Sequence, residues 1–172
     1  NGMTAKRMTA LTIAQIGIMS ATLSAGKTAL AFMPNIEIVS LLIILYSIYF
    51  GKKVILAVYI FIAVECMIWG INVWTLMYIY IWPALSLVSV IFRKKDSVIF
   101  WAVFSAAFGL MFGALGSLVY IFMGGFKTAF AWWISGIPMD IIHCIGNFVI
   151  MLVLYKPLRK VLNAVNGFTD RI

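Results

Sequence analysis

Long apolar runs, broken by short polar clusters, dominate the pattern of hydrophobic and polar positions along the chain. Because a bilayer crossing needs about 20 apolar residues, each run predicts a membrane helix, although the second is short for a full crossing. We expect six helices, over residues 8–26, 36–50, 53–70, 73–92, 98–123 and 128–155. The pattern therefore predicts an all-α membrane protein, a compact bundle of six transmembrane helices in one domain over residues 3–172.

The composition supports this fold class. Hydrophobic residues make up 65% of the 172 residues and charged residues only 10%, whereas a soluble domain carries about 25% charged residues. A soluble enzyme, a secreted disulfide scaffold and a disordered tail are excluded. Asn1 and Gly2 precede Met3 and look like a remnant of protein production, and we see no cleavable signal peptide after Lys6 and Arg7.

The net charge of +8 is distributed unevenly between the two sets of breaks. One set holds most of the basic residues: Lys6, Arg7, Lys52, Lys53, Arg93, Lys94, Lys95, Lys156, Arg159, Lys160 and Arg171. The alternate breaks hold only Lys27 and Lys127. The positive-inside rule places the basic breaks and both termini in the cytoplasm, which requires an even number of crossings. The charge thus indicates membrane orientation in a multi-pass cell-membrane protein, and not a nucleic-acid partner.

The first outward connection is apolar, which is unusual for a loop in water. It runs from Lys27 to Asn35, and Pro34 disfavours a continued helix through it. We expect this segment to lie over the mouth of the bundle as a lid, with the candidate residues Phe32, Pro34, Asn35 and Glu37. Glu37 could alternatively cap the second helix, because acidic residues suit helix N-termini.

Ionisable residues inside the apolar runs are costly and require a partner or a function. Helical spacing puts Glu65 and Trp69 on one face of the third helix. On the fourth helix it groups Trp74, Tyr78 and Trp82. On the sixth it aligns Trp133, Asp140, His143 and Asn147 in one stripe. We predict an outward-facing pocket with two acidic acceptors and aromatic walls. Its candidate substrate-binding residues are Glu65, Trp69, Trp74, Tyr78, Trp133, Asp140, His143 and Asn147.

A second interpretation of the same residues needs no ligand. Tryptophan and tyrosine gather at membrane interfaces, so Trp74, Tyr120 and Trp132 could belong to an aromatic belt. Asp140 and His143 could satisfy each other as packing residues. Small residues also recur at helical spacing, as Ala10, Ala14, Gly17, Ala21 and Ala25 in the first helix and as Ser105, Gly109, Gly113 and Gly116 or Ser117 in the fifth. Such stripes let helices approach closely, and for the fifth helix we expect internal packing.

Several chemistries lack the residues that they need. The single histidine and the unclustered Cys66 and Cys144 give no metal site and no disulfide framework. No phosphate-binding glycine loop or serine nucleophile motif is present, so we expect no catalytic residues, no cofactor and no ATP hydrolysis by this chain.

Three runs carry a family resemblance that covers nearly the whole chain. They are Met33-Pro-Asn-Ile-Glu37, Ala107-Phe-Gly-Leu-Met-Phe-Gly113 and Trp132-Trp-Ile-Ser-Gly-Ile-Pro-Met-Asp140-Ile-Ile-His143, together with Ala10-x-x-x-Ala14. With these runs the sequence resembles the bacterial substrate-binding S components of energy-coupling factor (ECF) transporters.

The resemblance implies a small-molecule vitamin or micronutrient as cargo, bound near the outer face under the loop after the first helix. It implies a membrane coupling protein and two cytoplasmic ATPases as partners, with Ala10 and Ala14 at the docking position. The acidic acceptors favour a flat nitrogenous cargo, with a queuosine precursor first, and a thiamine-like cation or a cobalamin-related compound next. The alternatives are a membrane enzyme that uses Asp140 and His143 as acid and base, and a free-standing proton-coupled carrier.

Overall fold

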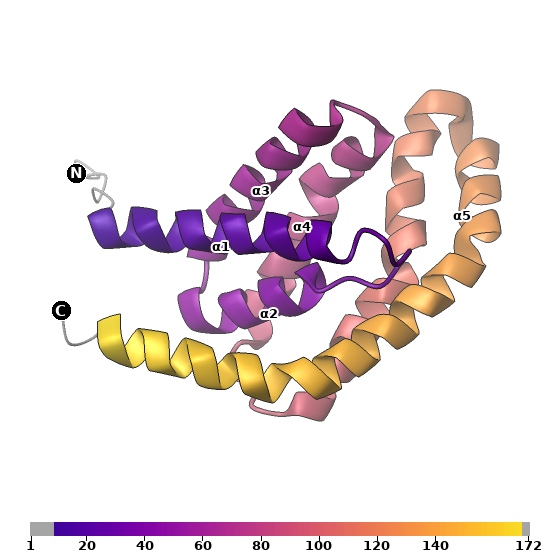
Figure 1. Cartoon of the computed structure of the whole chain (residues 1–172). Coiled ribbons are helices and arrows are strands. Elements are labelled where there is room, and N and C mark those ends of the chain that lie inside the picture. The colour runs from indigo at the N-terminus through magenta and orange to yellow at the C-terminus, as the bar shows by residue number, and fades with distance from the viewer. Residues whose placement is uncertain (1–8, 170–172) are drawn as a thin grey trace, which may run out of the picture.

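The computed structural model describes residues 9–169 and the side chains of residues 9–165. Over this range every regular element is a helix and no strand is present, which confirms the all-α prediction. The helices are α1 (Ala10–Ala29), α2 (Val39–Phe50), α3 (Lys53–Trp69), α4 (Val73–Phe92) and α5 (Val98–Thr169) (Figure 1). The expected start of the first helix at residue 8, and the basic residues Lys6, Arg7 and Arg171, lie outside the described residues.

The longest helix, α5, is two helical arms joined at a tight turn. Gly124 and Gly125 have non-helical backbone angles, and the φ of 77° at Gly125 is one that glycine adopts without strain. The chain reverses there, so that an outgoing arm (residues 98–123) and a returning arm (residues 126–169) run side by side near the turn (Figure 1). The expected break after residue 123 is confirmed. The returning arm continues well beyond the expected end at residue 155, through Pro157.

Two of these helices could cross a membrane by length and composition, namely α4 and the stretch of α5 from Val98 to Val165. α2 is apolar but shorter. Large apolar side chains are also exposed on the outside of the bundle, among them Ile18, Ile91 and Ile99, each with more than half of its surface accessible. Soluble monomers rarely present such surfaces to water, whereas lipid-facing helices do.

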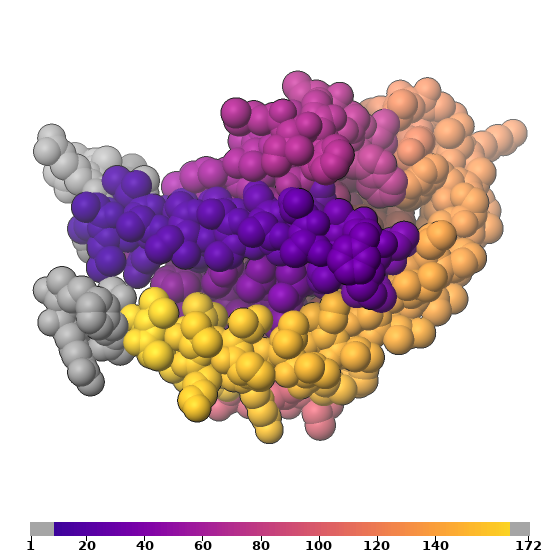
Figure 2. Space-filling model, viewed as in Figure 1, coloured from indigo at the N-terminus to yellow at the C-terminus, as the bar shows by residue number. Residues whose placement is uncertain are grey.

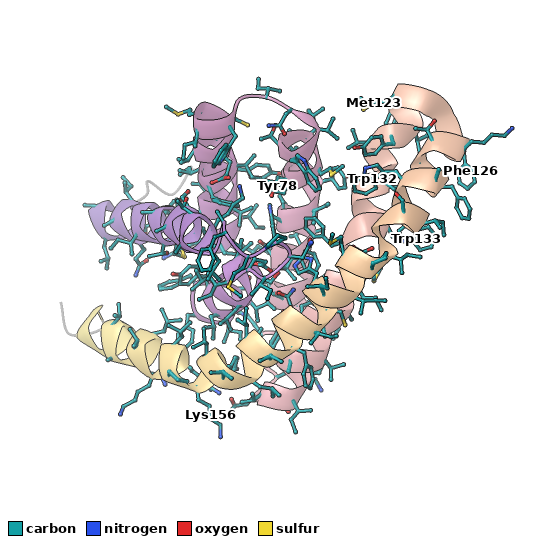
Figure 3. The ribbon with its side chains drawn as sticks, turned by 45° about the vertical axis from the view of Figure 1, so that its right-hand side comes forward. Tyr78, Met123, Phe126, Trp132, Trp133 and Lys156 are labelled. Carbon is teal, nitrogen blue, oxygen red and sulfur yellow. The ribbon has the colours of Figure 1, made fainter. Side chains whose placement is uncertain are left out.

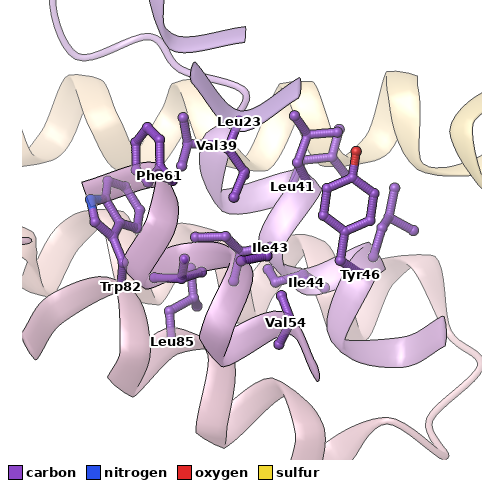
Figure 4. Packing of buried hydrophobic residues seen from close by; sticks show 14 of the residues in the cluster. Leu23, Val39, Leu41, Ile43, Ile44, Tyr46, Val54, Phe61, Trp82 and Leu85 are labelled. Atoms are coloured by element: carbon purple, nitrogen blue, oxygen red, sulfur yellow. The ribbon is translucent and has the colours of Figure 1, made fainter. Parts of the chain in front are cut away.

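The short helix α2 forms the centre of the core. Every residue from Val39 to Ser47 is buried, and α2 packs against α1, α3, α4 and α5. Figure 4 shows Ile43 and Ile44 of α2 among Phe61 of α3 and Leu85 of α4. A helix that is apolar on all sides is buried on all sides, which explains why this short run lies in the middle.

The two ends of the bundle differ in charge. At one end, which we call the basic end, Lys53 reaches Thr12 and Gln15 of α1. At the same end Tyr49 donates a hydrogen bond to Asn163 at 2.6 Å, and Arg159 pairs with Asp96. These contacts bring together the start of α1, the α2–α3 turn, the α4–α5 loop and the last part of α5.

The opposite end holds the α1–α2 segment, the α3–α4 turn and the turn of α5 (Figure 1). Figure 3 shows this separation along α5, with Met123 and Phe126 at one end and Lys156 at the other. Lys27 and Lys127 belong to the opposite end, and the other basic residues of the described range belong to the basic end. The fold therefore groups the charges as the alternating breaks predict.

Candidate functional site

A cavity of about 300 Å³ lies at the opposite end of the bundle, between α3, α4, both arms of α5 and the α1–α2 segment. Its lining is mostly apolar and aromatic, with a few charged or polar groups, which is typical of small-molecule sites. The residues that line it are Lys27, Thr28, Leu30, Ala31, Met33, Pro34, Asn35, Ile36, Glu37, Val39, Trp69, Trp74, Tyr78, Trp82, Phe112 and His143.

The segment over residues 30–38 covers this cavity, and three of the four expected lid residues line it. Pro34, Asn35 and Glu37 contribute to the lining, whereas Phe32 does not and is 76% exposed. Asn35 adopts a left-handed φ of 58°, which asparagine tolerates better than most residues, and its amide lies 3.2 Å from the sulfur of Met139. The segment is thus attached to the returning arm of α5.

Glu37 connects the covering segment to two helices. One carboxylate oxygen accepts a hydrogen bond from the backbone N–H of Ser40 at 2.8 Å, which caps the start of α2. The other oxygen lies 3.3 Å from Nε2 of His143 on the returning arm. The same side chain therefore caps the start of α2 and lines the cavity.

A second cavity of about 210 Å³ adjoins the first and shares Lys27, Trp69, Trp74 and Tyr78 with it. Glu65 lines this second cavity and is 1% exposed. Its Oε2 forms an ion pair with the ammonium of Lys27. That ammonium also lies 5.8 Å from the ring centre of Trp69 and 5.4 Å from that of Tyr78, within the range of cation–π attraction.

Aromatic contacts position the wall that α4 contributes. Tyr78 and Trp82 are one turn apart, and their ring centres lie 5.6 Å apart. Trp74 contacts Trp132 of the returning arm at 6.2 Å, and Trp132 stacks on Tyr120 at 4.8 Å. The three residues assigned to the alternative aromatic belt thus form one contact cluster, and Trp74 lines the cavities as well.

The sixth-helix stripe divides between the cavity and the helix packing. His143 lines the cavity, but Asp140 lies against the outgoing arm, where it accepts a hydrogen bond from the N–H of Gly113 at 2.9 Å. A Cβ on Gly113 would overlap this carboxylate, so the missing side chain makes room for Asp140. The expectation that Asp140 and His143 hydrogen-bond to each other is wrong, because Asp140 accepts from Gly113 and His143 pairs with Glu37.

Two further candidates also lie outside the cavity lining. Asn147 donates hydrogen bonds to the carbonyl of Ser105 at 3.2 Å and to the hydroxyl of Ser40 at 3.3 Å, which joins α2 to both arms of α5. Trp133 packs against Phe130 on its own arm. The candidates that line the cavities are Glu65, Trp69, Trp74, Tyr78 and His143.

The sequence left Lys27, Trp82 and Phe112 out of the proposed site. Trp82 continues the spacing of Trp74 and Tyr78, so its position was visible in the pattern. Lys27 gave a signal as well, because it is a lone cation beside an apolar outward segment.

No family model, curated protein or solved structure matches this chain. Among the described residues, no group of three or more histidine, cysteine or acidic residues could hold a metal ion. The case for a function therefore depends on the cavities and their surroundings.

Proposed function

We propose that this protein is the substrate-binding S component of an ECF-type importer, which captures a small nitrogenous micronutrient from outside the cell. The observation that carries the proposal is the aromatic-walled cavity beside the α1–α2 segment, which contains the contact between Glu37 and His143 and adjoins a second cavity that contains the ion pair of Lys27 and Glu65. A concave aromatic surface with a few fixed polar groups suits capture of a flat molecule.

In this proposal α1 to α4 and the two arms of α5 make six crossings, with both termini in the cytoplasm. The grouping of charge supports it, because Lys27 and Lys127 are the basic residues of the opposite end within the described range. The cavity then faces outward, where an importer first meets its cargo.

The cavity volume favours a ring-sized cargo. About 300 Å³ is at the lower end for ligand pockets. A queuosine precursor or a thiamine-like cation suits this space, whereas an intact corrinoid is far too large. The carboxylates of Glu37 and Glu65 supply acceptors for the N–H groups of such a heterocycle.

The outer face of α1 is the proposed docking surface for the membrane coupling protein and its ATPases. Ala10, Ala14, Gly17 and Ala21 are all exposed, while the buried side of α1 consists of Ile16, Met19, Ser20 and Leu23. Figure 2 shows that one side of α1 is uncovered along the length of the helix. A face of small residues allows another helix to approach closely.

Mass spectrometry of small molecules extracted from the purified protein tests the binding function. Trp69 lines both cavities and Trp133 lines neither, so the two tryptophans form a matched pair. We expect the wild type and Trp133→Ala to retain a nitrogenous heterocycle, and Trp69→Ala to lose most of it because one stacking wall is removed. Equal retention by both variants would contradict the assignment of the site.

Co-purification separates the importer from the alternatives. A coupling protein and two ATPases retained with the tagged chain would support the S component. Turnover of a lipid by the isolated chain would instead favour an enzyme, and uptake driven by a pH gradient would favour a free-standing carrier. The structure gives those alternatives little support, since Asp140 is engaged by Gly113 and lies outside the cavity lining.

A further inference from the structure

Three groups in the second cavity form a site for a cation, which we call the cation cage: Glu65, Trp69 and Tyr78. The carboxylate is 1% exposed, and both rings lie within cation–π distance of the ammonium of Lys27. A buried carboxylate flanked by aromatic faces is the arrangement by which proteins recognise organic cations. In this structure the cage holds a side chain of the protein itself.

The Lys27 ammonium uses only one of the two carboxylate oxygens of the cation cage. Lys27 pairs with Oε2 of Glu65, while Oε1 is buried and has no hydrogen-bond partner in the described part of the chain. The indole N–H of Trp82, another residue of the cavity lining, is likewise buried and unpartnered over that range. An ammonium is a point charge, whereas a planar group with two parallel N–H bonds satisfies both oxygens of a carboxylate at once.

The occupant is also placed so that it can leave. Lys27 belongs to the last turn of α1, directly before the covering segment, and its side chain is 28% exposed. Its four-carbon stem is flexible, whereas Glu65 is held inside the bundle on α3. Movement of Lys27 toward water would free the cage without unfolding any helix.

The charges that line the cavities favour a cationic ligand over an anionic one. The cavities hold two carboxylates, from Glu37 and Glu65, and one lysine, with His143 beside Glu37. An anion would approach Lys27 but would also meet both carboxylates, whereas a cation that replaces Lys27 keeps the existing pairing and adds a hydrogen bond to the unpartnered oxygen.

From these observations we infer that the cargo carries a planar cationic group with paired N–H donors, such as an amidinium or a protonated amino-heterocycle, and that this group displaces Lys27 from Glu65. Lys27 is the resident occupant of the cation cage when cargo is absent. This inference rests on the proposed function, because it assigns the cargo of the same cavity.

Three probes of matched shape test the inference: benzamidinium, benzamide and benzoate, which carry a positive, a zero and a negative charge. Calorimetric titration of the purified full chain in detergent should show binding of benzamidinium alone. Binding of benzoate in place of benzamidinium, or binding of none of the three probes, would overturn the inference. This comparison uses the wild type and does not depend on the folding of any variant.

Variants then test the displacement. Removing the competitor in Lys27→Gln should tighten benzamidinium binding by at least about tenfold, which corresponds to 1.4 kcal/mol, because the ligand no longer has to replace a charge-assisted hydrogen bond to Glu65. Glu65→Gln should weaken it by at least about tenfold. Lys127→Gln is the matched control, an exposed lysine at the same end, and should leave binding unchanged.

Weaker benzamidinium binding by Lys27→Gln would show that Lys27 holds the ligand and is not displaced by it. That result would overturn the inference and leave the proposed function intact, because retention of cargo by Trp133→Ala and its loss from Trp69→Ala would be unaffected. Failure of the extraction experiment, in contrast, would remove the proposed function itself.

Discussion

Gly109 lies where the two arms of α5 approach closely, and its replacement by alanine tests the packing of the bundle. A Cβ at this position would lie 2.9 Å from both the carbonyl carbon and the carbonyl oxygen of His143, and 3.0 Å from the backbone nitrogen of Cys144. These atoms are backbone, so they cannot rotate away as the end of a flexible side chain could. The arms would have to separate.

Two opposing effects set the change in the free energy of unfolding that Gly109→Ala causes. Alanine in place of glycine within a helix favours folding by up to about 1 kcal/mol. Overpacking of a filled interface costs about 1–3 kcal/mol. Gly136 provides the first term without the second, because a Cβ there meets nothing within 4 Å. We therefore expect Gly109→Ala to be less stable than Gly136→Ala by about 1–3 kcal/mol.

Unfolding in mixed micelles with increasing dodecyl sulfate, followed by far-ultraviolet circular dichroism, measures this difference. Both variants change one glycine of α5 to alanine, so the helix-propensity term largely cancels. Equal stability of Gly109→Ala and Gly136→Ala would refute the close approach of the arms.

Two further predictions concern the interior and the orientation of the bundle. Replacing Asn147 by leucine removes its hydrogen bonds to Ser105 and Ser40 and should lower the free energy of unfolding by about 0.5–2 kcal/mol in the same micelle assay; an unchanged midpoint would contradict the bridging role. In a chain without its native cysteines, Lys127→Cys should react with an impermeant maleimide added to intact cells and Lys94→Cys only after lysis, and the reverse labelling would contradict the proposed orientation.

The apolar runs predict the helices well because hydrophobicity and helix breakers act locally. The break near Gly124, the turn at Gly51 and the cap at Asn72 all lie where the pattern changes. The ends are less well predicted. The returning arm passes through Pro157 and ends far beyond the last apolar run. Its last part still packs on the bundle through Leu158 and Leu162, which a scan for long apolar runs does not register.

Faces within single helices were also visible in the sequence, since spacing alone sets which side chains share a side. Tyr78 and Trp74 line the cavities together, and so do Glu65 and Trp69 in the second cavity. The small residues of the outgoing arm do pack internally, as expected, because Gly109 and Gly113 contact the returning arm.

The sequence did not show which residues of other helices each face would contact. Asp140 and His143 lie on one stripe, but Asp140 meets Gly113 of the other arm while His143, one turn further along, meets Glu37. The neighbours of a stripe change along the helix because the packed helices cross at an angle, and no local rule specifies the crossing.

The sequence by itself determined that this chain is helical, apolar on its outside and basic at alternate breaks. These properties depend on local stretches of sequence and not on which helices contact one another. Only the tertiary structure decided that Lys27 meets Glu65 between two aromatic rings. Such a pairing joins α1 to α3, and its existence depends on how the helices pack around α2 and not on the spacing within either helix.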